Sequence, residues 1–197
     1  MRKLIPLMLL LAGALWAVAL NVVDLVSPAD LTHLAKDAVY ALKVDDAALS
    51  PADVDKLSKW VQAGHCLIVY DCKVAARLGF HAQPVAPGNA QSTTTQFGKD
   101  ARPVAVMDAM STGRHPAVQW LTSVTVAALL YPDNTVSAVA PDSSCTPLLT
   151  TVDQKAALAA VRPLGKGKIV FKPFVITNPA GVQFNQQLDD WMATGKN

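Results

Sequence analysis

Residues 38–80 decide the fold, and they read AVYALKVDDAALSPADVDKLSKWVQAGHCLIVYDCKVAARLGF. Two short apolar runs, 38–44 and 66–70, stand on either side of a segment in which apolar residues recur at helical spacing. The second run has no polar alternation, which is typical of a strand that is covered on both faces. The order strand, helix, strand at this spacing predicts a right-handed crossover within a parallel sheet.

The helix between these two strands has clear end signals. Ser50 is a favoured N-cap residue, Pro51 suits the first helical position, and Asp53 completes a variant of the capping box. Gly64 supplies a left-handed residue that ends the helix. A second, shorter helix is predicted at residues 73–78, shortly after the second strand.

The later part of the chain is rich in strand signals. Residues 82–102 carry prolines and a polar run, which predicts a surface loop or a pair of surface strands. Beyond Gly113, apolar runs alternate with turn residues such as those at 132–134, and this pattern predicts several short strands. A final helix is expected after Asn178, because apolar residues then recur on one helical face.

The N-terminus predicts export. Arg2 and Lys3 precede an uninterrupted apolar run at 4–20 that ends in small residues, which is typical of a secretory signal peptide over residues 1–19. An uncleaved membrane anchor is the alternative, since about 17 apolar residues lie at the short limit for crossing a bilayer. We expect residues 20–197 to form one domain that is periplasmic or secreted, or held at a membrane through that run alone.

Composition excludes one class of partner. The chain has 197 residues, of which 51 % are hydrophobic and 16 % charged, so it can bury a core and is not disordered. Its formal net charge is +2, and loss of Arg2 and Lys3 with the signal peptide would bring that charge to zero. A neutral domain lacks the basic surface that nucleic acids require, so no nucleic-acid partner is expected.

The three cysteines, Cys66, Cys72 and Cys145, lie in a chain that is expected to be exported, where disulfides form. A continuous strand would separate Cys66 from Cys72 by about 20 Å, whereas a disulfide needs Cα atoms within about 7 Å. Any intrachain bridge would therefore use Cys145. Three buried, reduced thiols are the alternative, because free cysteine is among the most buried residue types.

Several short motifs together carry a family resemblance. They are Leu49-Ser50-Pro51-Ala52-Asp53, Trp60-Val61-Gln62-Ala63-Gly64, Leu67-Ile68-Val69, His115-Pro116, Gly165-Lys166-Gly167-Lys168-Ile169-Val170, Asn178 and Asn185. This set resembles the non-catalytic branch of the class I glutamine amidotransferase-like superfamily, in particular bacterial envelope domains of unknown function. The resemblance implies an α/β fold of the flavodoxin-like kind, with a mostly parallel sheet, helices on both faces and a β-rich C-terminal half.

Cys72 is the candidate nucleophile. In active members of the superfamily the catalytic cysteine stands on the turn between a strand and the next helix, and Cys72 occupies the corresponding place. Asp71 and Lys73 flank this thiol where the resemblance implies small residues, and the chain has no glutamate to orient a histidine base. The candidate catalytic set, Cys72, His115 and Asp71, therefore lacks a complete triad, and a buried or bridged thiol is the alternative for Cys72.

A ligand crevice in such a fold is expected at the carboxyl ends of the parallel strands. Trp120 is added to the candidates because it lies on no apolar helix face and suits a binding surface. The predicted binding residues are Lys43, Asp45, Asp71, Cys72, His115 and Trp120. No histidine has a partner at the helical spacing of a metal site, so neither a metal nor a cofactor is predicted.

The sequence thus favours a non-enzymatic, exported binding or interaction domain of the cell envelope, whose partner is another envelope protein. The alternative is a degenerate cysteine-dependent hydrolase or amidotransferase, which would need a reactive Cys72 thiol within reach of His115 or His65.

Overall fold

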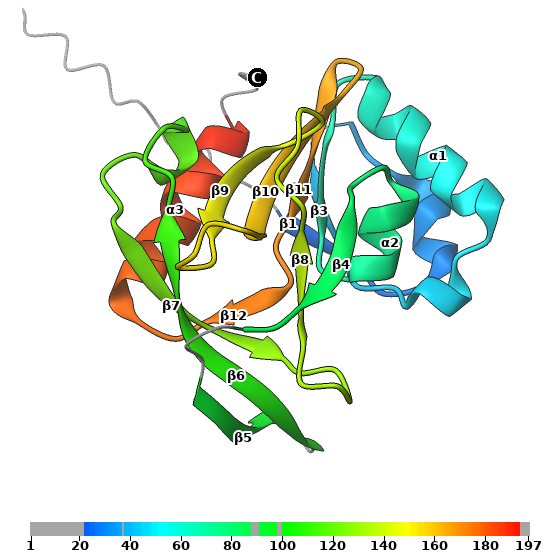
Figure 1. Ribbon diagram of the computed structural model, residues 1–197. Helices are drawn as coiled ribbons and strands as arrows, with labels where there is room; N and C mark the ends of the chain where they lie inside the picture. The colour runs from blue at the N-terminus through cyan, green and yellow to red at the C-terminus, as the bar shows by residue number, and fades with distance from the viewer. Residues whose placement is uncertain (1–21, 37, 88–90, 98–99, 194–197) are drawn as a thin grey trace, which may run out of the picture.

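The computed structural model describes residues 22–36, 38–87, 91–97 and 100–193. The predicted signal peptide or anchor at residues 1–19 lies outside the described residues. One sheet connects almost all of the chain, in the order β1-β2-β3-β11-β10-β9-β6-β7-β12, with β5 paired to β6 and β4 paired to β8. It curls around α3 into a half-barrel (Figure 1).

Four neighbouring strands form the parallel part of the sheet. They are β1 (Val22–Leu25), β2 (Val39–Leu42), β3 (Cys66–Val69) and β11 (Gly167–Phe171). Helix α1 (Pro51–Gln62) connects β2 to β3, and these strands pair in parallel register with Tyr40 opposite Leu67. The crossover predicted from residues 38–80 is therefore confirmed.

The helix ends follow the local signals. The Ser50 hydroxyl accepts a hydrogen bond from the Asp53 amide at 3.2 Å, and the Asp53 carboxylate accepts one from the Ser50 amide at 2.9 Å. Gly64 has φ +121°, so it adopts the left-handed conformation that ends the helix. Helix α2 (Cys72–Arg77) follows β3 and is itself followed by Gly79, with φ +90°. The first of these helices is confirmed with its end signals, and the second is confirmed one residue earlier than the predicted range 73–78.

The remaining strands are antiparallel to their neighbours. They are β4 (Ala82–Val85), β5 (Gln91–Phe97), β6 (Asp100–Ser111), β7 (Ser123–Leu129), β8 (Val136–Val139), β9 (Thr146–Thr150), β10 (Ala157–Leu164) and β12 (Phe174–Ile176). The β-rich second half is as predicted, and strands rather than a loop occupy much of residues 82–102. The elements β1 and β12 and the short 3-10 helices η1 (Pro28–His33), η2 (Asp46–Ala48) and η3 (Pro116–Val118) were not predicted.

The predicted flavodoxin-like architecture, with a mostly parallel sheet, is wrong. The reason lies in the connections: parallel neighbours need a long crossover, whereas a chain reversal over a few residues places strands antiparallel. Gly165, with φ +62°, turns β10 back onto β11 in this way, and Asn134, with φ +59°, lies in the short turn between β7 and β8. Most of the sheet is therefore a curled antiparallel extension of a small parallel part.

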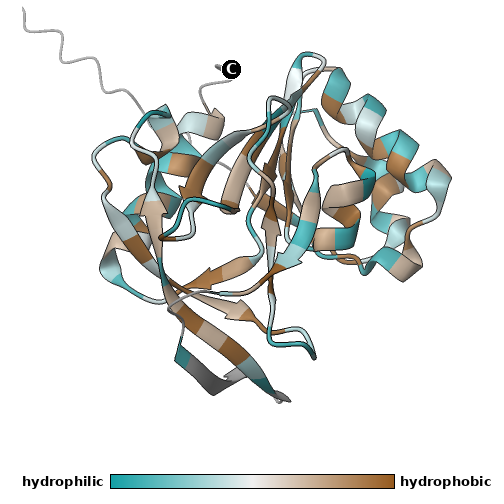
Figure 2. Cartoon of the chain, in the orientation of Figure 1, coloured by the Kyte–Doolittle hydropathy of each residue, from teal (hydrophilic) through white to brown (hydrophobic). Residues whose placement is uncertain are grey.

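Two buried clusters cover the two faces of the parallel strands. Alternate residues of β2 and β3 point to α1 and α2 on one face, where Leu57, Leu67 and Val69 are fully buried. On the other face, Ala41 and Ile68 meet α3 (Pro179–Ala193), whose Phe184 is also fully buried. The apolar colours of the strands and the polar outer faces of α1 show this division (Figure 2).

All three cysteines are buried and free. The alternative of three reduced thiols therefore describes the structure, and the bridge to Cys145 does not form in it. Among the described helices, none combines the length and the apolar character that crossing a membrane would require.

Candidate functional site

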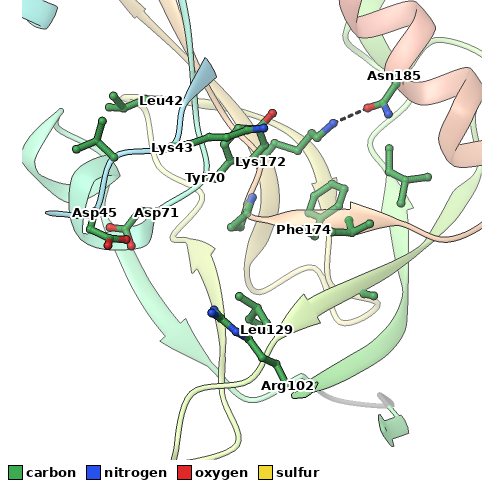
Figure 3. A pocket seen from close by; sticks show the side chains of 15 residues that line it. Leu42, Lys43, Asp45, Tyr70, Asp71, Arg102, Leu129, Lys172, Phe174 and Asn185 are labelled. Atoms are coloured by element: carbon green, nitrogen blue, oxygen red, sulfur yellow. Dashed lines mark hydrogen bonds between the residues drawn. The ribbon is translucent and has the colours of Figure 1, made fainter. Parts of the chain in front are cut away.

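A cavity of about 710 Å³ opens at the carboxyl ends of β2, β3 and β11, between these strand ends and β12 (Figure 3). We call it the carboxyl pocket. Its volume lies in the usual range for small-molecule sites, and the carboxyl edge of parallel strands is where ligands of open α/β sheets bind. The lining residues are Leu42, Lys43, Val44, Asp45, Tyr70, Asp71, Arg102, Ala127, Leu129, Lys172, Pro173, Phe174, Val175, Ile176 and Asn185.

The polar wall is built around Lys172, the first residue after β11. Its backbone amide donates to the Val69 carbonyl at 2.9 Å, which places the side chain at the sheet edge. The Lys172 ammonium donates to Oδ1 of Asn185 on α3 at 2.5 Å. Burial lowers the pKa of Lys172, and the charge of Asp189 opposes that effect.

Tyr70 and Lys43 complete this wall from the ends of β3 and β2. Burial raises the pKa of the Tyr70 hydroxyl, and the nearby Lys43 charge opposes the rise. Lys43 forms an ion pair with Asp24 at 2.7 Å, and that hydrogen bond raises the pKa of Lys43. In Figure 3 the side chains of Lys43, Tyr70 and Lys172 lie together on the same side of the pocket.

Two carboxylates lie at the other side. Asp45 and Asp71 come from the loops after β2 and β3, and Figure 3 shows them close to one another and away from Asn185. Oδ1 of Asp71 accepts a hydrogen bond from the Val74 amide at 2.8 Å, so Asp71 is the N-cap of α2. Its role in the structure is therefore to begin that helix.

The third wall is apolar and comes from β7 and β12. Phe174 is buried behind it, whereas Leu129 and Val175 are 45 % and 50 % exposed. Exposed large apolar side chains beside a cavity leave apolar surface available to a ligand. The pocket thus combines a cationic and hydroxyl-bearing wall, an acidic side and an apolar wall, and Arg102 of β6 also lines it.

The predicted binding residues divide between two ends of the molecule. Lys43, Asp45 and Asp71 line the carboxyl pocket. His115 and Trp120 do not, because they lie around η3, before β7, whereas Leu129 at the other end of β7 lines the pocket. Six strand steps correspond to about 20 Å, so the structure separates the two groups.

Cys72 lies at the first position of α2 but is only 5 % exposed and does not line the pocket. Burial raises the pKa of its thiol, and the hydroxyls of Ser137 and Tyr131 interact with it. A nucleophilic cysteine requires the opposite change, a lowered pKa at an accessible thiol. Cys72 thus stands between β3 and α2, as the sequence suggested for a nucleophile, but its surroundings are those of a structural thiol.

Neither candidate histidine is among the groups that surround Cys72. Nδ1 of His115 accepts from the Ala117 amide at 3.1 Å, the His115 ring packs edge-on against Trp191, and burial lowers the pKa of His115. His65 stacks on Trp60 with 4.6 Å between ring centroids. In the part of the chain that the structure describes, no three His, Cys, Asp or Glu side chains gather as a metal site.

Trp120 is 84 % exposed, the most exposed large hydrophobic residue of the described chain. Its backbone has φ +73°, a left-handed conformation that is rare for a bulky residue. It is the third residue of the turn in which the Leu121 amide donates to the Val118 carbonyl. Trp120 therefore projects from the end of the molecule that is opposite to the carboxyl pocket along β7.

Sequence reasoning missed the centre of the pocket, which is formed by Lys172, Asn185 and Phe174. Lys172 directly follows β11, and the rule that residues after parallel strands line the crevice would have found it if β11 had been placed beside β3. Asn185 and Phe174 gave no such signal, because only the curl of the sheet brings α3 and β12 to this edge.

Comparison with known proteins gives the fold without a family. No family model matches the chain, and no curated protein matches it. A solved N-terminal domain of IFT52 (mmIFT52) is similar, with a TM-score of 0.52 and 11 % identity, and the match covers 81 % of this chain and 78 % of that one. At this identity the similarity concerns the fold alone.

Two further solved structures fall below a TM-score of 0.5. One is a β-galactosidase from Bacillus circulans sp. alkalophilus, with a TM-score of 0.49, 7 % identity and 80 % of this chain covered. The chain spans only 22 % of that enzyme's length. The other is a putative ThuA-like protein from Parabacteroides merdae, with a TM-score of 0.44, 13 % identity, and coverage of 80 % of this chain and 71 % of that one.

The resemblance to non-catalytic class I glutamine amidotransferase-like domains is therefore wrong as an assignment. No family model supports it, and the curled, largely antiparallel sheet differs from the flavodoxin-like sheet that it implied. The motifs that suggested it, such as Ser50-Pro51 and the glycines at 165 and 167, are caps and turns that many α/β crossovers share.

Proposed function

We propose that this chain is a non-enzymatic binding domain, exported to the cell envelope, that interacts there with another envelope protein. The exposed Trp120 carries the proposal. Tryptophan is enriched among the residues that dominate binding energy at protein interfaces, and strained backbone conformations cluster at functional sites. Trp120 combines both features, with 84 % exposure and a φ of +73°.

Two further observations support the proposal. The basic and apolar pattern of residues 1–19 is that of a secretory signal peptide or a membrane anchor. The burial of Cys72, which raises the pKa of its thiol, weighs against the cysteine-dependent hydrolase or amidotransferase that is the alternative.

Site-specific photocrosslinking tests the interaction. A photoreactive phenylalanine analogue placed at Trp120 in the native host is expected to give one discrete crosslinked product with an envelope protein. The same analogue at Val182, which is 68 % exposed on α3, is the matched control and should give no such product. Equal crosslinking from both positions, or none from Trp120, would contradict the proposed interface.

Mass spectrometry of the protein purified from its native compartment tests export and the absence of catalysis together. We expect either a chain that begins at Leu20 or an intact one in the membrane fraction, and slow alkylation of Cys72 at neutral pH. Rapid alkylation of Cys72 alone, with an apparent pKa below about 8.5, would favour the enzyme instead. An intact chain in the cytoplasm would contradict export.

A further inference from the structure

The charge of Lys172 is not neutralised by a carboxylate in direct contact. In the described residues its hydrogen-bond partner is the neutral amide of Asn185, and its ammonium lies 5.9 Å from the Phe184 ring centroid. Asp189 acts on it through its charge but forms no ion pair with it within the described chain. A partly buried cation beside a cavity is stabilised when an anion enters that cavity.

Other donors lie on the same wall. Because Oδ1 of Asn185 accepts from Lys172, the amide nitrogen of Asn185 is left as a donor. The Tyr70 hydroxyl lies between the ends of β2 and β11, near the Lys43 charge. A carboxylate has two oxygens that accept several hydrogen bonds, so ammonium, amide and hydroxyl donors together match its geometry.

The rest of the cavity defines the rest of the ligand. Leu129 and Val175 expose apolar surface at its rim, and Phe174 is buried on the opposite face of β12 against Phe184. Burial of this surface against a hydrocarbon or aromatic body is favourable, because it removes apolar area from water. A fully polar anion would leave this wall exposed to water.

The acidic side of the pocket limits the charge of the ligand. Asp45 and Asp71 face the cavity from the loops after β2 and β3, opposite the wall that carries Asn185 (Figure 3). A second negative group that reached this side would meet like charges at short range, which is unfavourable. On the side of Asp45 and Asp71, one anionic group directed at Lys172 is therefore preferred over two, whereas Arg102 lines the cavity beside Leu129.

We infer that the carboxyl pocket binds an amphipathic organic monoanion, a molecule with one carboxylate held by Lys172, Asn185 and Tyr70 and an apolar body against Leu129 and Val175. The inference depends on the proposed function only in that the domain binds its ligand without transforming it. The pocket and Trp120 lie at opposite ends of β7, so ligand and protein partner occupy separate surfaces.

Three six-carbon probes test the inference on the full chain. Hexanoate carries one carboxylate, hexanol carries none and adipate carries two. Titrations followed by amide NMR shifts are expected to give saturable shifts around Tyr70 and Phe174 with hexanoate, and at least about tenfold weaker binding with hexanol and adipate. Equal binding of hexanol, or no saturable shift with hexanoate up to about 10 mM, would overturn the inference.

Matched variants locate the effect at one ammonium. Lys172→Met should weaken hexanoate binding by about tenfold, because the charge-assisted hydrogen bond is lost. Hexanoate should then bind this variant no more tightly than hexanol does. Lys172→Arg retains the charge and should retain most of the affinity. Lys155→Met, at a lysine whose side chain is 84 % exposed outside the pocket, should bind as the unaltered protein does. Unchanged binding by a folded Lys172→Met variant would overturn the inference.

The two proposals fail in distinguishable ways. Loss of hexanoate binding, together with a specific crosslink from Trp120 and an unreactive Cys72, would reject the pocket ligand alone. Chemical conversion of a carboxylic acid derivative by the protein, abolished by Cys72→Ser, would reject the non-enzymatic function whatever the probes do.

Discussion

The two ends of strand β11 carry lysines in contrasting surroundings. Lys168, at the amino end, is only 4 % exposed and its ammonium lies 3.9 Å from the Trp191 ring centroid. Lys172, at the carboxyl end, lines an open cavity. Helix α3 contributes to both ends, with Trp191 near the first and Asn185 near the second. The amino end is filled by aromatic packing, and the carboxyl end is left hollow.

The amino end leaves almost no free space. A Cβ atom at Gly167, the first residue of β11, would lie 2.0 Å from the Val61 carbonyl oxygen. Burial in this region raises the pKa of Cys66 to about 12 and lowers the pKa of Lys168. The contrast shows that a polar side chain at a strand end marks a ligand site only where the neighbouring elements leave a cavity beside it.

The largest expected effect is a difference in stability loss between substitutions at the amino end and at the carboxyl end of β11. Trp191→Ala should lower the free energy of unfolding by about 4 kcal/mol, because it removes a large buried aromatic side chain. Val175→Ala, at a half-exposed position of the pocket rim, should change it by less than about 0.5 kcal/mol. Urea denaturation of both variants measures the difference. Similar losses from the two would show that the pocket rim is as tightly packed as the amino end.

A smaller effect tests whether Asp71 serves the helix or the pocket. Asp71→Ala should cost about 1 kcal/mol of stability, because the Val74 amide at the start of α2 loses its acceptor. Asp71→Asn keeps a capping oxygen and should cost only a few tenths of a kcal/mol, while it removes the charge from the pocket. Thermal unfolding compares them. Equal destabilisation by both variants would mean that the carboxylate charge, rather than the cap, stabilises the fold.

The smallest effect concerns the pH dependence that Lys172 imposes. Because burial lowers the pKa of Lys172 in the folded state, the unfolded chain binds its proton more tightly, and stability rises as the pH increases from the lowered pKa towards 10.5. Lys172→Met lacks this pH-dependent contribution. Near neutral pH its free energy of unfolding should therefore exceed that of the unaltered protein by up to about 1 kcal/mol, and this difference should shrink as the pH rises towards 10.5.

Urea denaturation between neutral pH and pH 10.5 measures this narrowing. Lys155→Met serves as the control, because the Lys155 side chain is 84 % exposed and lies outside the carboxyl pocket. A constant difference for Lys172→Met across the interval would show that Lys172 is fully solvated in the folded state.

Much of the backbone could be predicted from the sequence, because its signals are local. The capping pair Ser50 and Asp53, and the left-handed Gly64, act within a few residues and hold in the structure. The strand β12 could not be predicted, because it has three residues and its pairing with β7 depends on a partner far away in the chain. The sheet was misassigned for a similar reason, since one clear crossover was extended to strands that reverse through short turns.

The candidate site was predicted in part for the same physical reason. Lys43, Asp45 and Asp71 follow apolar runs that are recognisable as parallel strands, so their place at the sheet edge is a matter of chain direction. His115 was assigned to that edge too, but it packs against Trp191 near Lys168 instead. Nothing local distinguishes the two edges for a residue in a loop.

The sequence by itself determined the crossover, the helix ends and the apolar faces, since these depend on side chains that are near neighbours along the chain. Only the tertiary structure decided which strand ends enclose a cavity and which are filled. The curl of the sheet brings Lys172, Phe174 and Asn185 to the ends of β2 and β3, and it buries Cys72 while leaving Trp120 exposed. These outcomes depend on long-range packing, which no local pattern encodes.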